Sequence, residues 1–405
     1  MTAALLRQWP KLKRLIMAFG LFGLVIWPAA GWYGHDLVSD EYARFQALPG
    51  LHVTPSAIVG RDFVNIWHGG HEALKGAEGI YDRTEYRRTL RAAADVYGIY
   101  AFSYPPHMLM LSVPFGFPPY LWSLALWLIG TFALFIWAAR PWLKEAGLPL
   151  WSVLLLPGAL VNLWAGHFGY LIGGLALLGW WHAGRRPGLS GASFALMSVK
   201  PHMGIMVPFI LAAKHQWSTI AWATFGTLAL VLASTLAFGM DAWTTWLTST
   251  LSFQVGLIDP GAQREYYYMM PTVGRMLMAI DREGPILLGQ ILFGLITMAM
   301  LVWADRRGAR LADIGLLSIT GTMLILPYSF NYDLVALSLI ALVWAARSPA
   351  RWWSPERLAY GAMFVAPIAQ VPLAREGVWL SPVAILAAFA FAAWRSGRDW
   401  AAHPA

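Results

Sequence analysis

The chain has 405 residues, of which 58% are hydrophobic and only 12% are charged. Soluble domains carry about 25% charged residues, so this composition excludes an ordinary soluble enzyme and predicts a membrane protein with several spans. The formal net charge of +8 could suggest nucleic acid, but the basic residues gather in short segments between apolar runs, which argues against that partner. The chain contains no cysteine, which excludes disulfides and thiol chemistry.

Apolar runs of roughly 17–25 residues, long enough to cross a bilayer, recur along the chain. They include residues 15–33, 120–139, 217–239, 285–304 and 379–394. The basic clusters fall at 11–14, 140–144, 185–186, 305–310, 347–357 and 395–398. Positive residues mark cytoplasmic loops. We therefore expect these clusters inside, and the two long polar segments, 34–104 and 241–284, on the outer side.

The first outer segment contains the stretch GRDFVNIWHGGHEAL at residues 60–74. Its Asp62 could act as a general base that takes a proton from a hydroxyl. The alternative is a helix cap, because FVNIW directly follows. Asp36, Asp40 and Glu41 compete for the base role but lie in a plainly solvated run just after the first apolar segment.

His68, His71 and Glu72 are spaced so that they share one helical face, as metal ligands can. The Gly69-Gly70 pair would make a poor scaffold, and the pattern is not a standard metal signature. Polar lining of a cleft or plain surface is therefore the favoured interpretation, and we expect no metal.

Two later stretches do not fit full crossings. Residues 105–117 are rich in proline and too short for a span. Residues 190–214 lie between two basic clusters yet carry Lys200-Pro201 in their middle, where proline breaks a helix. This pattern predicts two half-helices whose tip, Lys200, lies deep in the protein. A lysine at that depth marks a functional site, here for a phosphate, or else snorkels to the interface.

Further polar motifs stand near expected span borders. They supply His107 in FSYPPH, His167 in NLWAGHFGYL, His202 in SVKPH, Arg264 and Tyr266 in REYYYMMP, and Asn331 and Asp333 in LPYSFNYDL. Arginine binds phosphate and tyrosine faces stack on sugar rings, although a tyrosine run is also simply interfacial. Asp333 is either an N-cap of the next span or a ligand of a sugar hydroxyl.

Taken together and in this order, GRDFVNIWHGGHEAL, FSYPPHMLMLSVPFG, SVKPH and LPYSFNYDL resemble glycosyltransferase family 87. That family belongs to the GT-C superfamily of multi-spanning enzymes that use polyprenyl-phosphate sugars. The resemblance implies that Asp62 is the catalytic base and that Lys200, in its Lys-Pro pair, lies near the donor phosphate. The chain departs from the family in having Gly166-His167 where a Gly-Gln-like pair is expected, and His202 where glutamine is commoner.

The expected fold is an all-α polytopic membrane protein, a GT-C-type bundle of about 11–13 transmembrane or half-membrane helices. One integral membrane domain would cover residues 1–405. The outer loops 34–104 and 241–284 would form its active-site face, and the first would carry helices lying in the interface plane.

The expected activity is inverting transfer of a hexose, with mannose the first choice, from a polyprenyl-phosphate donor to a lipid-linked or glycan acceptor. The reaction would take place at the periplasmic face of a bacterial inner membrane, without a cofactor or nucleic acid. Lys200, His202 and Arg264 would bind the donor phosphate. Other substrate contacts would come from His68, His107, His167, Tyr266, Asn331 and Asp333.

The alternative function is a transporter or flippase of a lipid-linked or anionic substrate. Broken helices and charges at membrane depth also suit transporters. The lack of a detectable internal repeat, and the long outer segment that carries Asp62, favour the enzyme.

Overall fold

The computed structural model describes residues 52–54, 57–77, 79–97, 100–258, 267–281 and 286–396. The expected first span at 15–33 lies outside them. Strands β1 (His52–Thr54) and β2 (Ala57–Ile58) form a short antiparallel pair. The other elements are helical, and the first of them are α2 (Phe63–Ala73), α3 (Arg83–Ala94), α4 (Pro106–Gly116), α5 (Tyr120–Glu145), η1 (Leu150–Leu155), α6 (Pro157–Ala165), α7 (Gly169–His182), α8 (Pro187–Met197), η2 (Pro201–Gly204) and α9 (Val207–Ala213).

The second half of the chain is also helical. Its elements are α10 (Trp217–Ile258), α12 (Val273–Ile280), α13 (Ile286–Arg306), α14 (Leu311–Ile325), η3 (Asn331–Leu334), α15 (Val335–Arg347), α16 (Pro355–Arg375) and α17 (Ser381–Ser396). One cluster of buried apolar side chains extends from α2, α3 and α4 to α17, so these elements share a core.

Three of these helices are long and apolar enough to cross a membrane: α5, α10 and α13. They coincide with the runs predicted at 120–139, 217–239 and 285–304, which confirms that these runs are helices long and apolar enough to cross a membrane. Other apolar helices are shorter, such as α14 with 15 residues and α17 with 16. At 1.5 Å per residue, about 22–24 Å, these fall short of a bilayer core of about 30 Å.

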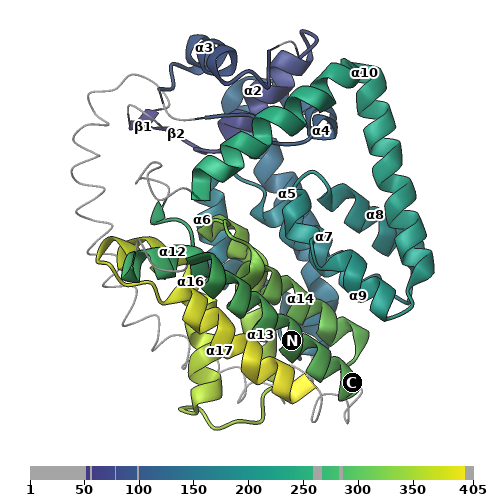
Figure 1. Cartoon of the computed structure of the whole chain (residues 1–405), viewed down its shortest axis with the longest axis vertical. Helices are drawn as coiled ribbons and strands as arrows, with labels where there is room; N and C mark the ends of the chain where they lie inside the picture. The colour runs from purple at the N-terminus through teal and green to yellow at the C-terminus, as the bar shows by residue number, and fades with distance from the viewer. Residues whose placement is uncertain are drawn as a thin grey trace.

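Ion pairs hold the predicted basic segments together at one end of the bundle. Arg310 pairs with Glu145 and Asp313, Arg347 with Asp313, Arg395 with Glu356, and Lys214 with Asp305. These contacts join the ends of α5, α15 and α17 to the starts of α14 and α16, and the end of α9 to the end of α13. Helices α2, α3 and α4 lie together at the opposite end, at the top of Figure 1.

The chain breaks between α8 and α9 as expected, with Lys200 just before the 3₁₀ turn η2. Gly184, which precedes α8, lies beside Gln216, which follows α9. Both ends of the segment therefore return to the same side of the bundle. Lys200, at its tip, is only 5% exposed. The hairpin prediction is confirmed for this segment.

Helix α10 bends at Gly239, whose φ of 80° and ψ of 164° are not helical. An L-residue rarely adopts this conformation, and glycine tolerates it because it has no Cβ. Beyond the bend the helix crosses the α2–α4 end of the molecule, above α5 (Figure 1). There Trp246 Nε1 donates a hydrogen bond of 3.1 Å to the carbonyl of Ser103.

Helix α2 is seated on α4 and on the link between α6 and α7. A Cβ at Gly70 would lie 2.1 Å from the carbonyl oxygen of Ser112 in α4, so the two backbones touch. The Gly69-Gly70 pair therefore serves close helix packing. At the N-terminus of α2, the backbone N–H of Asp62 donates to the carbonyl of Ala165 at 2.9 Å. These contacts set the position of Asp62.

Candidate active site

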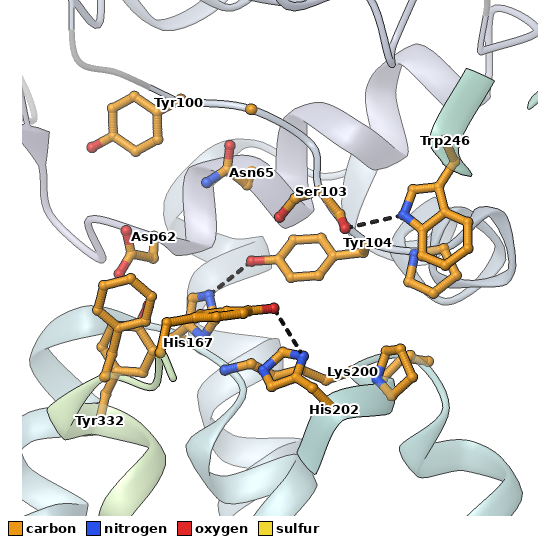
Figure 2. Close-up of a pocket in the computed structure, with 16 residues that line it drawn as sticks. Asp62, Asn65, Tyr100, Ser103, Tyr104, His167, Lys200, His202, Trp246 and Tyr332 are labelled. Carbon is orange, nitrogen blue, oxygen red and sulfur yellow. Dashed lines mark hydrogen bonds between the residues drawn. The ribbon is translucent and has the colours of Figure 1, made fainter. Parts of the chain in front are cut away.

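A cavity of about 100 Å³ opens beneath the N-terminus of α2. Its wall comes from six parts of the chain that lie far apart in sequence (Figure 2). They contribute Asp62 and Asn65 from α2, the stretch 100–105, His167 between α6 and α7, residues 199–202 at the hairpin tip, Trp246 of α10, and Tyr328, Phe330 and Tyr332 before α15. The cavity is therefore assembled only in the folded bundle.

Asp62 faces this cavity although it stands at the N-cap position of α2. Its side chain makes no capping hydrogen bond, and it is 9% exposed. Among the described residues none donates a hydrogen bond to its carboxylate. Burial raises the pKa of Asp62, while the nearby charges of Arg61 and Lys200 act to lower it and that of Asp333 to raise it. A buried carboxylate with free acceptor positions and a raised pKa is suited to take up a proton.

Lys200 lies on another wall of the cavity and is paired with a carboxylate behind it. Its Nζ is 2.5 Å from Oδ1 of Asp333, and both side chains are nearly or fully buried. The ammonium is also 5.5 Å from the centre of the Tyr332 ring, which lines the cavity. Asp333 itself is not part of the cavity wall. The Lys200 ammonium therefore lines the cavity, whereas its partner Asp333 contacts it from outside the cavity.

Aromatic and histidine side chains form much of the remaining wall (Figure 2). Tyr104 Oη is 2.8 Å from His167 Nε2, and the rings of His167 and Tyr332 are 4.3 Å apart. Tyr328 Oη is 3.2 Å from His202 Nδ1. Burial raises the pKa of Tyr104 well above its ordinary value, with the charge of Asp62 adding to the effect, so the phenol is neutral. These groups offer ring faces and neutral hydrogen-bonding atoms to a polar ligand.

Of the residues predicted from the sequence, the structure brings four to this cavity: Asp62, His167, Lys200 and His202. Arg264 and Tyr266 lie outside the described residues. The other predicted contacts, His68, His107, Asn331 and Asp333, are buried but do not line the cavity.

The four predicted residues that do not line the cavity have partners inside the protein. His68 Nε2 is 2.9 Å from Thr89 Oγ1, and burial lowers its pKa to about 4, so its ring is neutral. His107 contacts Ser198 next to the hairpin tip. Asn331 donates to the carbonyl of Pro367. The remaining residue, Asp333, binds Lys200 and accepts from the backbone N–H of Phe330. The N-cap of η3 is Phe330 and that of α15 is Leu334, so the prediction of Asp333 as the N-cap of the next span is wrong.

The metal interpretation of α2 has no support in the geometry. Within the described ranges, His68, His71 and Glu72 do not form a cluster that could hold an ion. Instead His71 stacks on Trp67 and Glu72 accepts a hydrogen bond from Lys75.

The sequence did not single out several residues of the wall. They are Asn65, Tyr104, Trp246, Tyr328, Phe330 and Tyr332. Most of them stand inside the motifs discussed above, so the motif was the signal, although the prediction named other residues of it. Trp246 lies in the predicted polar loop 241–284, which is helical as far as Ile258 in the structure, and no local pattern marks this residue.

Comparison with known proteins gives one match. The family model described as glycosyltransferase family 87 matches residues 102–327, more than half of the chain. The matched part contains Tyr104, His167 and Lys200; it begins after Asp62 and ends before Asp333. No curated protein and no solved structure matches the chain.

Proposed function

Because the chain belongs to glycosyltransferase family 87, we propose that the cavity beneath α2 is where this membrane glycosyltransferase transfers a sugar to a hydroxyl acceptor. The observation that carries the proposal is that one cavity is lined by both a possible base and a cation. Asp62 presents a buried carboxylate with free acceptor positions, and Lys200 presents a cation. Glycosyl transfer with inversion needs both, a base for the acceptor and a positive charge for the leaving group.

In the proposed reaction, Asp62 takes the proton of the acceptor hydroxyl as its oxygen attacks the anomeric carbon. The new glycosidic bond forms on the face opposite the phosphate, so the configuration at that carbon inverts. The bond between the anomeric carbon and the phosphate oxygen breaks, and its electron pair leaves with the phosphate. Lys200 stabilises the charge that develops there, supported by His202 and, from the outer segment, Arg264.

The charges of the cavity support a donor with a single phosphate. In the described part of its wall, Lys200 is the one lysine or arginine side chain, and Asp333 offsets part of its charge. A phosphodiester carries one negative charge, whereas a nucleotide diphosphate sugar carries two and commonly binds with a metal. A polyprenyl-phosphate hexose fits this arrangement, and the family resemblance makes mannose the first sugar to test.

The position of the cavity supports catalysis on the outer face. The cavity lies at the α2–α4 end of the molecule, opposite the basic segments that mark the cytoplasmic side. In a bacterial inner membrane that end faces the periplasm, where nucleotide sugars are absent. An activated sugar must then arrive on a lipid, which accounts for an enzyme built largely of membrane helices.

Transfer can be tested with the purified protein in liposomes, using polyprenyl-phosphate mannose with a radiolabelled sugar and lipids from a strain that lacks the enzyme. We expect Asp62→Asn to reduce transfer by about 10²–10⁴, because asparagine keeps the shape but cannot accept the proton. Asp82→Asn is the matched control, since Asp82 caps α3 at the surface. Mass profiling of the deletion strain identifies the acceptor. Movement of label across the bilayer without a new glycosidic bond would replace the proposal with a transporter.

A further inference from the structure

The partner of Lys200 is placed so that it cannot meet a ligand in the cavity. A lysine ammonium has three N–H donors, and Asp333 accepts from one of them at 2.5 Å. The Asp333 side chain is fully buried. On its own side it borders a second cavity of only about 20 Å³, which has room for about one water and is too small for a sugar or a phosphate. Asp333 therefore acts on the active site only through Lys200.

Asp333 is itself firmly held. Its second carboxylate oxygen accepts a hydrogen bond of 3.1 Å from the backbone N–H of Phe330. The turn η3 that carries it is tied down on both sides, since the N–H of Asn331 donates to Met269 and its side chain donates to Pro367. The carboxylate is therefore a fixed point against which a long lysine side chain can be oriented.

We propose that Asp333 is a positioning residue that holds the Lys200 ammonium in place and directs its two remaining N–H groups into the cavity. The proposal rests on the function given above, in which Lys200 binds the phosphate of the donor. A lysine stem has four rotatable bonds, so an unsupported ammonium would be poorly placed, and burial without a counter-charge disfavours the cation. A fixed carboxylate behind the ammonium removes both problems and leaves the cavity side free.

Binding of radiolabelled polyprenyl phosphate tests this proposal, because that compound is the leaving group whichever sugar is transferred. We expect Lys200→Met to weaken binding at least tenfold and Asp333→Asn about tenfold, since hydrogen bonds to charged groups are worth roughly that factor or more. If Asp333 acts only through Lys200, the double variant Lys200→Met/Asp333→Asn binds no more weakly than Lys200→Met alone.

The control is Asp313→Asn, which breaks a buried acid–arginine pairing at the far end of α14. We expect it to lower stability while leaving the affinity of the folded protein unchanged. Should Asp333→Asn fail to fold, Asp333→Glu carries the test, because it keeps the charge and displaces it by one methylene; measurable weakening supports the proposal.

Two results overturn the positioning role while leaving the proposed function intact. One is wild-type or tighter binding by folded Asp333 variants, and the other is multiplication of the two losses in the double variant. Wild-type binding by Lys200→Met would remove Lys200 from the phosphate site, and it would overturn both the positioning role and that part of the proposed function.

Discussion

Asp62 and Asp82 both stand at the N-terminus of a helix, but they use their side chains differently. Asp82 Oδ1 accepts from the backbone N–H groups of Thr84 and Glu85, at 2.8 and 3.0 Å. Asp62 makes no capping bond and turns its carboxylate to the cavity. An aspartate that gives up the cap, and is buried as well, is placed there at a cost to stability, which is typical of functional groups.

The raised pKa of Asp62 predicts the pH dependence of transfer. Only the ionised carboxylate can act as the base, so kcat/KM should fall as the pH drops through this pKa. Burial places that fall at a higher pH than an exposed aspartate, with a pKa of about 3.9, would give. The charges of Arg61 and Lys200 act to lower the pKa of Asp62, and that of Asp333 acts to raise it. If kcat/KM did not fall in acid, or fell only at the pH expected for an exposed aspartate, this role of Asp62 would be contradicted.

The same group should affect stability with the opposite sign to an ordinary salt-bridged aspartate. The folded state binds the Asp62 proton more tightly than the unfolded state, so stability is lost as the pH rises through the folded pKa. We therefore expect Asp62→Asn to raise the Tm at neutral pH, and the gain to shrink in acid. Thermal unfolding in detergent at several pH values measures this. A Tm below that of the wild type at neutral pH would show that Asp62 has a structural role.

At this scale the sequence indicated Asp62 and Lys200 correctly as cavity residues, because ionisable groups in an apolar chain are few. It could not indicate that Lys200 pairs with Asp333, which lies 133 residues away. Nor could it separate His167, which lines the cavity, from His68 and His107, which do not. Whether a buried histidine faces a cavity or the core depends on packing, and packing is not visible in local patterns.

Among the elements, α2 depends on its close contact with α4. We expect Gly70→Ala to cost about 1–3 kcal/mol or more, because the added Cβ would meet backbone atoms of Ser112 and Gly116 that cannot rotate away. Transfer should fall as well, since α2 carries Asp62. Gly130→Ala in α5 is the control: nothing lies within 4 Å of its Cβ position, and we expect a gain of up to about 1 kcal/mol. Equal Tm values for the two variants would contradict the contact.

The hairpin of α8 and α9 is joined to η3 by the pair between Lys200 and Asp333. Removing one partner of a buried ion pair leaves the other charge uncompensated, and we expect Lys200→Met to cost about 3–5 kcal/mol. The double variant Lys200→Met/Asp333→Asn buries no charge at this place and should recover most of that loss. Thermal unfolding of the wild type and the three variants measures the coupling. If the losses of stability in Lys200→Met and Asp333→Asn simply add in the double variant, the ion pair does not hold the hairpin.

The break at Lys200-Pro201 was predictable, because proline cannot continue a helix and a lysine rarely lies within a span. The bend at Gly239 was visible only as the end of an apolar run. The packing of the bent arm over the outer end, through Trp246, depends on side chains that resemble any lipid-facing residue in the sequence.

For the whole molecule, the arrangement of basic and polar ends predicts the topology. A chain without cysteine permits single cysteines to be placed at Tyr97, which is 54% exposed beside α3, and at Arg307, which is exposed beyond α13. We expect an impermeant thiol reagent added to intact cells with a permeabilised outer membrane to label only the first position. Labelling of only the second would invert the topology and remove the argument for a lipid-linked donor.

The long apolar helices α5, α10 and α13 could be predicted from the sequence because hydropathy is a property of composition, read over windows of about 19 residues. Their orientation stays a prediction from loop charge. The number of crossings could not be predicted. Helices such as α14 and α15 have 15 and 13 residues, and their length depends on where neighbouring helices let the chain turn.

The long separation between Lys200 and Asp333 also has a consequence for synthesis. At about 5–20 residues per second, the 133 residues between them take roughly 7–27 s to translate. During that time the tip of the hairpin has no counter-ion, and an ammonium at the centre of a bilayer costs about 2.5–3.5 kcal/mol even on insertion scales. We therefore expect the segment of α8 and α9 to remain at the membrane surface or beside the translocon, and to enter its final position only after η3 has been made.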